Sequence, residues 1–124
     1  YLEGTGSLLL DREFNKAYCA LSPRADEELF IEFCEDFDMS PIIFEAFQTV
    51  NGERKAIYHT NVMMCIAETF AVICADCIDD KKERKMVLEN LKLAIEKDAS
   101  LKDLAKKDRE FIKYFENSDF LAIF

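Results

Sequence analysis

The sequence has 124 residues, of which half are hydrophobic and a third are charged, with only three glycines and two prolines. This balance is typical of a folded domain and excludes a disordered chain. Sixteen basic against 25 acidic side chains leave a net charge of −9, which argues against nucleic acid or an anionic membrane as a partner. No run approaches the ~18 apolar residues that span a bilayer, and no signal peptide is visible. We therefore expect a cytoplasmic protein.

The first part of the chain predicts two short strands, a helix and a third strand. Apolar runs at residues 6–10 and 17–21 are typical of strands, and the polar residues 11–13 between them form a turn. Residues 26–37 predict a helix, because apolar side chains recur at three- and four-residue steps: they are Leu29, Phe30, Phe33 and Phe37. Residues 41–47 predict a strand.

The second part repeats this order of elements. Asn51-Gly52 is a strong hairpin-turn signal before His59. Residues 61–66 and 70–75 predict strands, and Asp79 or Asp80 caps a helix that ends near Ile95. That helix carries Met86, Val87, Leu91 and Ile95 on one face.

We expect the 26–37 and 80–95 helices to pack on the same side of a mixed sheet. In place of a closing strand, Asp98 to Glu116 predicts a second amphipathic helix, followed by a short apolar end.

Two motifs suggest chemistry. His59 is the only histidine, and an imidazole titrates near neutrality, so it is a natural general acid or base. A structural histidine that bonds a backbone carbonyl is the alternative. Glu3 precedes Gly4 and Gly6, which allow the backbone to turn sharply and to approach a ligand.

Three segments together resemble the guanidino-group-modifying, or pentein, superfamily: Leu2–Ser7, Leu21–Asp26 and His59–Met64. This superfamily includes arginine deiminases, dimethylarginine dimethylaminohydrolases and amidinotransferases, and the segments are most similar to a bacterial branch of citrulline hydrolases. The resemblance runs from about Leu2 to about Leu91. It implies an α/β fold, namely a partial α/β-propeller of about two ββαβ modules plus a C-terminal amphipathic helix.

The resemblance also implies domain limits. Residues 1–97 would form a partial pentein domain of amidinotransferase type, and residues 98–124 a divergent helical tail. The family's N-terminal modules and its Gly-rich loop with the nucleophilic cysteine have no counterpart here. We therefore expect an internal fragment that is inactive alone and that self-associates through open sheet edges.

The family's site residues transfer to four positions. Glu3 and His59 match two members of the catalytic triad, in which the acid orients the imidazole. Arg24 matches an arginine that binds the substrate α-carboxylate, which a guanidinium contacts with two hydrogen bonds. Asn61 stands where arginine deiminases carry an aspartate. Its uncharged amide suits the neutral ureido group of citrulline, and side-chain alternation along a strand places it on the same face as His59.

The resemblance implies a small-molecule substrate, citrulline or an arginine derivative, and neither cofactor nor metal. In its mechanism a cysteine attacks the ureido or guanidino carbon, His59 protonates the leaving nitrogen and then activates water, and Glu3 orients His59.

Two other functions stay open at this point. One is a non-enzymatic truncated remnant. The other is a small thiol or interaction domain that uses Cys74 and Cys77, a C-x-x-C pair between a strand and a helix. Acidic neighbours disfavour a reactive thiolate there, and a zinc site would need two further ligands. The five cysteines, an odd number without secretory context, predict reduced thiols.

Overall fold

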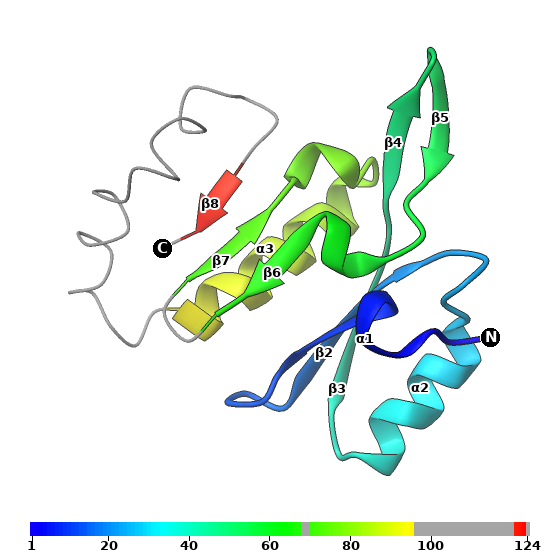
Figure 1. Cartoon of the computed structure of the whole chain (residues 1–124). Coiled ribbons are helices and arrows are strands. Elements are labelled where there is room, and N and C mark those ends of the chain that lie inside the picture. The colour runs from blue at the N-terminus through cyan, green and yellow to red at the C-terminus, as the bar shows by residue number, and fades with distance from the viewer. Residues whose placement is uncertain (68–69, 96–120, 124) are drawn as a thin grey trace.

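The computed structural model describes residues 1–67, 70–95 and 121–123 of the chain (Figure 1). The first unit contains one short helix, two strands, a longer helix and a third strand. These elements are α1 (Gly4–Ser7), β1 (Leu8–Asp11), β2 (Lys16–Leu21), α2 (Glu27–Asp36) and β3 (Ser40–Glu45). The predicted strand at 17–21 and helix at 26–37 are confirmed. The strand predicted at 6–10 begins only at Leu8, because Gly4–Ser7 form a helical turn.

The first sheet has the order β1-β2-β3. β1 pairs with β2 antiparallel and β3 pairs with β2 parallel, so that Tyr18 stands beside Leu9 on one side and Ile42 on the other. Asp11 Oδ1 accepts backbone hydrogen bonds from Glu13 at 3.1 Å and Phe14 at 3.2 Å, which fixes the turn between β1 and β2. The parallel pair needs the crossover that α2 supplies.

A hairpin separates the two units of the fold. β4 (Phe47–Val50) and β5 (Glu53–Ala56) form a two-stranded sheet of their own, which projects from the rest of the molecule in Figure 1. Asn51 and Gly52 have φ angles of 52° and 84°, the left-handed values of a tight hairpin turn. The turn prediction is confirmed, but the strand predicted at 41–47 ends at Glu45, and β4 belongs to a different sheet.

The second unit starts with a short 3₁₀ helix and contains one more α-helix. Its elements are η1 (Thr60–Val62), β6 (Met64–Ile66), β7 (Ala71–Ile73), η2 (Ala75–Cys77), α3 (Lys81–Ile95) and β8 (Leu121–Ile123). Asp80 caps α3, since its Oδ1 accepts from the backbone N–H groups of Lys82 and Glu83 at 2.8 and 2.9 Å. The prediction of one strand over 61–66 is wrong for its first part, where η1 replaces extended backbone.

The second sheet has the order β6-β7-β8, and both pairings are antiparallel. It differs from the first sheet, in which the closing strand β3 runs parallel to β2. The predicted helix at 98–116 lies outside the described residues, and so does the predicted limit between residues 97 and 98. None of the helices in the described ranges is long and apolar enough to cross a membrane.

The helices and sheets alternate in layers, which corrects one prediction. Ala17 and Cys19 of β2 belong to a buried cluster with Phe30 of α2, whereas Tyr18 of β2 belongs to a second cluster with Leu91 of α3. Since successive side chains of a strand point to opposite faces, α2 and α3 cover opposite faces of the first sheet. They do not lie on the same side, as the sequence predicted.

The α3 helix therefore lies between the two sheets. Its buried side chains belong to one cluster with residues of both sheets, and α3 contacts both β3 and β8. The cluster includes Tyr18, Ile42 and Phe44 of the first sheet, Met64, Ala71 and Ile73 of the second, and Val87 and Leu91 of α3. The resulting order is α2, first sheet, α3, second sheet, which is a mixed α/β architecture.

This packing predicts that Leu91→Ala will lower the free energy of unfolding by about 2–5 kcal/mol, because it opens a cavity between the two sheets. The matched control is Leu93→Ala on the same helix. The Leu93 side chain is 54% exposed, so we expect a change within about 0.5 kcal/mol. Urea denaturation followed by circular dichroism measures both. Equal losses in the two variants would contradict the position of α3.

Candidate active site

The glutamate of the N-terminal turn and the single histidine meet, although 56 residues separate them in sequence. Glu3 Oε2 lies 2.5 Å from His59 Nε2, and about 30% of each side chain is exposed. A carboxylate only accepts hydrogen bonds, so Nε2 carries the proton in this contact. In the described part of the chain Nδ1 has no hydrogen-bond partner, which leaves it available to a reacting group.

Backbone contacts hold the glutamate in place. Glu3 stands at the N-terminus of α1, and its N–H donates to the carbonyl of Arg24 at 3.0 Å. The N–H of Ser7 donates to the carbonyl of Glu3 at 3.2 Å, which closes the helical turn. The Ser7 hydroxyl also donates to the Arg24 carbonyl, at 3.1 Å. The turn is therefore attached twice to the segment that follows β2.

Gly6 packs directly against the imidazole ring. A Cβ atom placed on Gly6 would lie 3.0 Å from Cγ of His59 and 3.1 Å from Nδ1, tighter than most Cβ contacts, so the ring would have to shift by a few tenths of an ångström. A Cβ on Gly4 would meet nothing within 4 Å. The two glycines of the motif thus differ in role, because Gly6 alone provides room for the ring.

A buried threonine fixes the segment that carries His59. Thr60 is fully buried, and its hydroxyl accepts from the backbone N–H of Ala20 at 2.8 Å and donates to the carbonyl of Ser7. These bonds join β2, the α1 turn and the start of η1. The sequence analysis did not identify Thr60 or Ser7 as residues that support the site, since a lone Thr or Ser has no spacing pattern that reveals its partners.

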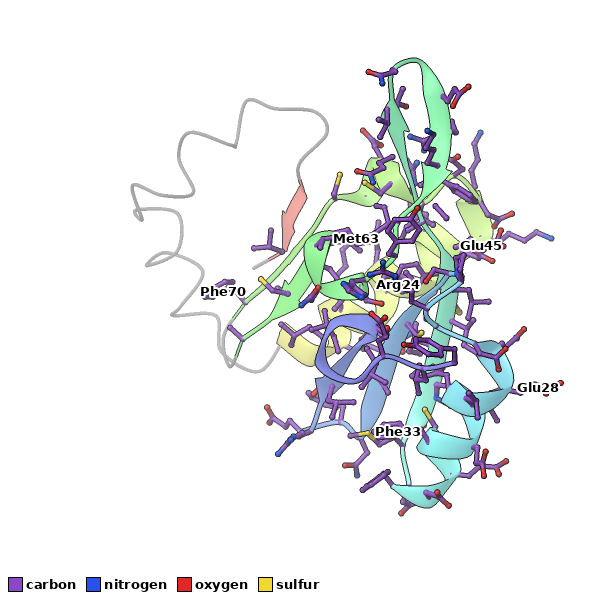
Figure 2. The ribbon with its side chains drawn as sticks, turned by 45° about the vertical axis from the view of Figure 1, so that its right-hand side comes forward. Arg24, Glu28, Phe33, Glu45, Met63 and Phe70 are labelled. Carbon is purple, nitrogen blue, oxygen red and sulfur yellow. The ribbon has the colours of Figure 1, made fainter. Side chains whose placement is uncertain are left out.

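Arg24 completes the charged group. One of its guanidinium nitrogens lies 3.8 Å from Glu3 Oε2, and the guanidinium stands over the ring of Tyr58, 5.1 Å from its centroid. Ser22 supports this arrangement, because its hydroxyl donates to the Tyr58 carbonyl and accepts from the Arg24 N–H. About half of the Arg24 side chain is exposed. In Figure 2 it lies beside the α1 turn, near the middle of the molecule.

Asn61 is placed differently from the expectation. Because Thr60–Val62 form a 3₁₀ helix, strand alternation does not relate Asn61 to His59, and the inference that they share one face of a strand is wrong. Asn61 instead lines a neighbouring cavity of about 260 Å³, here called the Asn61 cavity. Its other lining residues are Val62, Met63, Met64, Cys65, Val72 and Cys74.

The thiols of the described residues differ in environment. Burial raises the pKa of Cys19 to about 12, with a smaller contribution from Cys34, and burial also raises the pKa of Cys34. Burial, followed by a hydrogen bond to Cys74, raises the pKa of Cys77 to about 12. These three thiols keep their protons at neutral pH and are weak nucleophiles. Cys65 is exposed and Cys74 half-buried.

Comparison with known families identifies the chain. The family model described as N,N dimethylarginine dimethylhydrolase, eukaryotic, matches residues 1–111. The chain belongs to this family. The predicted membership of the guanidino-modifying superfamily is thereby confirmed, and the match extends beyond Leu91, where the resemblance seen in the sequence ended. Searches of curated proteins and of solved structures gave no match.

The family takes its name from a hydrolase. No cluster of three or more His, Cys, Asp or Glu side chains suited to a metal ion is present among the described residues.

The close approach of Gly6 predicts that Gly6→Ala will displace the imidazole and lower the free energy of unfolding by about 1–3 kcal/mol. Because His59 is the only histidine, its ring signals in a ¹H–¹⁵N NMR spectrum report the displacement without overlap. Gly4→Ala is the matched control, and we expect unchanged ring signals. If the His59 ring signals and the free energy of unfolding are the same in Gly6→Ala and Gly4→Ala, the packing of Gly6 on His59 is refuted.

Proposed function

We propose that this chain supplies the acid–base pair and the carboxylate-binding arginine of a cysteine-dependent hydrolase. Its substrate is citrulline or an arginine derivative, attacked at the ureido or guanidino carbon. The observation that carries the proposal is the 2.5 Å contact between Glu3 Oε2 and His59 Nε2 in a chain of this family. In the proposed reaction His59 protonates the leaving nitrogen and then activates water, while Glu3 orients the ring.

Arg24 has the chemistry of a substrate anchor. Its half-exposed guanidinium has one weak ion-pair contact, at 3.8 Å, and is held over the Tyr58 ring. A planar guanidinium binds a carboxylate with two parallel hydrogen bonds, which are stronger than this contact. We propose that the α-carboxylate of an amino-acid substrate binds Arg24 in place of Glu3. Glu3 then interacts with His59 only.

Asn61 favours a neutral substrate over a cationic one. Its side chain is exposed beside an otherwise apolar cavity, and an amide can donate to and accept from a ureido group. A dimethylguanidinium carries a positive charge that an amide does not neutralise. We therefore propose citrulline as the preferred ligand, as in the bacterial citrulline hydrolases that the sequence resembles, although the matching family is named for dimethylarginine.

The proposed chemistry needs a thiolate beside His59. Cys19, Cys34 and Cys77 have raised pKa values, and neither Cys65 nor Cys74 follows a Gly-rich loop of the kind that carries the nucleophile in the superfamily that the sequence resembles. We propose that the nucleophile is not one of these five thiols and that the 124-residue chain does not turn over its ligand by itself.

The test combines binding and turnover on the same sample. Citrulline should shift the His59 ring signals of the intact chain, and Arg24→Gln should weaken binding by about tenfold to a hundredfold, because it removes charge-assisted hydrogen bonds. Arg12→Gln, at an exposed arginine of the β1–β2 turn, is the control and should leave binding unchanged. We expect no ornithine by mass spectrometry.

The outcomes of this test separate the parts of the proposal. Dimethylarginine that binds more tightly than citrulline would overturn the choice of substrate alone. If Arg24→Gln and Arg12→Gln change citrulline binding equally, Arg24 does not bind the substrate. Release of ornithine that is lost in Cys65→Ser would show that the chain holds its own nucleophile.

We also propose that the chain self-associates through open sheet edges. β3 and β6 stand at the ends of their sheets, and no described strand pairs with their outer edges. Val62, next to β6, is 69% exposed. Sedimentation velocity should show a weight-average mass that increases with concentration. A single monomeric species over a hundredfold range would contradict this proposal.

A further inference from the structure

Cys74 and Cys77 stand at the two ends of η2 with their sulfur atoms in contact. The Cys77 thiol donates a hydrogen bond to the Cys74 sulfur at 3.0 Å, and the Cys77 N–H donates to the Cys74 carbonyl at 3.1 Å. The second of these bonds makes Cys74 and Cys77 the first and last residues of a four-residue turn, in which the Cα atoms lie less than about 7 Å apart. That separation lies within the range that a disulfide bridges.

The surroundings hold this pair at the wall of the Asn61 cavity. The Cys74 N–H donates to the Met63 carbonyl at 2.8 Å, which ties the end of β7 to the residue after η1. Cys74 lines the cavity, and both thiols are half-buried. On the other side Arg54, paired with Asp79, is the cation whose charge acts on Cys77, while Asp76 opposes it.

We propose that Cys74 and Cys77 are a redox site that closes reversibly to a disulfide by exchange with a small disulfide such as oxidised glutathione. The Cys74 thiolate attacks one glutathione sulfur, which forms a mixed disulfide and releases one glutathione thiolate. Cys77 gives its proton to the released glutathione thiolate and attacks the Cys74 sulfur, which closes the intramolecular bond and releases the second glutathione. Two protein thiols are oxidised and one glutathione disulfide is reduced to two thiols.

The geometry assigns different roles to the two sulfurs. Cys77 donates a hydrogen bond to Cys74, and Cys74 lines the Asn61 cavity whereas Cys77 does not, so Cys74 is the sulfur that an incoming disulfide reaches first. The ring closed by this disulfide contains only a few residues, and a short loop gains little chain entropy, so reduction reopens it. The bond would fix one wall of the Asn61 cavity. This inference does not depend on the proposed hydrolase chemistry.

The experiment equilibrates the intact chain with mixtures of reduced and oxidised glutathione, quenches it with acid and measures its mass. Cleavage after Lys55, Phe70 and Lys81 separates Cys65 from the pair. We expect the peptide with Cys74 and Cys77 to lose two hydrogen atoms, and dithiothreitol to restore them. Cys77→Ser should stop at the mixed disulfide, which adds one glutathione at Cys74. Cys65→Ser, at the exposed thiol of the same cavity, is the control and should keep the internal disulfide.

Two results would overturn the proposal. In the first, Cys74 and Cys77 both react with an alkylating agent at every ratio of oxidised to reduced glutathione, in the wild-type chain and in Cys65→Ser. In the second, the internal disulfide joins Cys65 to either partner. A Cys77→Ser chain that adds no glutathione would reject Cys74 as the attacking sulfur.

Discussion

The Thr60 hydroxyl is the contact on which the arrangement of the site depends. It is fully buried and bonds at once to the Ala20 N–H of β2 and to the Ser7 carbonyl of α1. An unpaired buried backbone group costs about 1–3 kcal/mol, so this one side chain satisfies two groups that the fold would otherwise leave without partners. Because Thr60 follows His59 directly, the same bonds position the imidazole over Gly6 and beside Glu3.

The layered packing explains why the site lies where the two units meet. α3 fills the space between the sheets, and Val87 and Leu91 are buried there with Tyr18 of the first sheet and Ile73 of the second. The units are therefore joined by a shared apolar core, while α1 contacts η1 at the edge of that core. Apolar burial of this kind holds the two units together, but it does not determine which partner a particular polar atom bonds. The hydroxyl bonds of Ser7, Ser22 and Thr60 supply that selection.

Sequence periodicity predicted the elements better than it predicted their arrangement. α2 and α3 were found because Phe30, Phe33, Val87 and Leu91 recur at helical spacing, and α3 also because Asp79 or Asp80 was expected to cap it, which Asp80 does. Periodicity says which face of a helix is buried, but not which side of a sheet it covers, so the two helices were wrongly placed on the same side. The 3₁₀ turn at Thr60–Val62 was missed because it leads directly into the apolar residues of β6, so that the whole segment resembles one strand.

In the candidate site, too, the sequence identified residues but not all of their contacts. The pairing of Glu3 with His59 followed from a family resemblance, since nothing local relates residues 56 positions apart. The contact of Glu3 with both an imidazole and a guanidinium was not visible in the sequence. Both His59 Nε2 and an Arg24 nitrogen approach the same oxygen, Oε2, at 2.5 and 3.8 Å.

That shared oxygen links the binding of substrate to the preparation of the imidazole. A carboxylate that competes for Arg24 would draw the guanidinium away from Glu3, and the strength of an ion pair decreases with distance. The Glu3 carboxylate would then interact with His59 alone, at the moment when a bound substrate makes an oriented imidazole useful. Tyr58 suits such a movement, because a ring face holds a guanidinium while it shifts and contributes no competing charge. In the proposed hydrolase, the residue that recognises the amino acid is thus also the one whose departure frees the acid to orient the base.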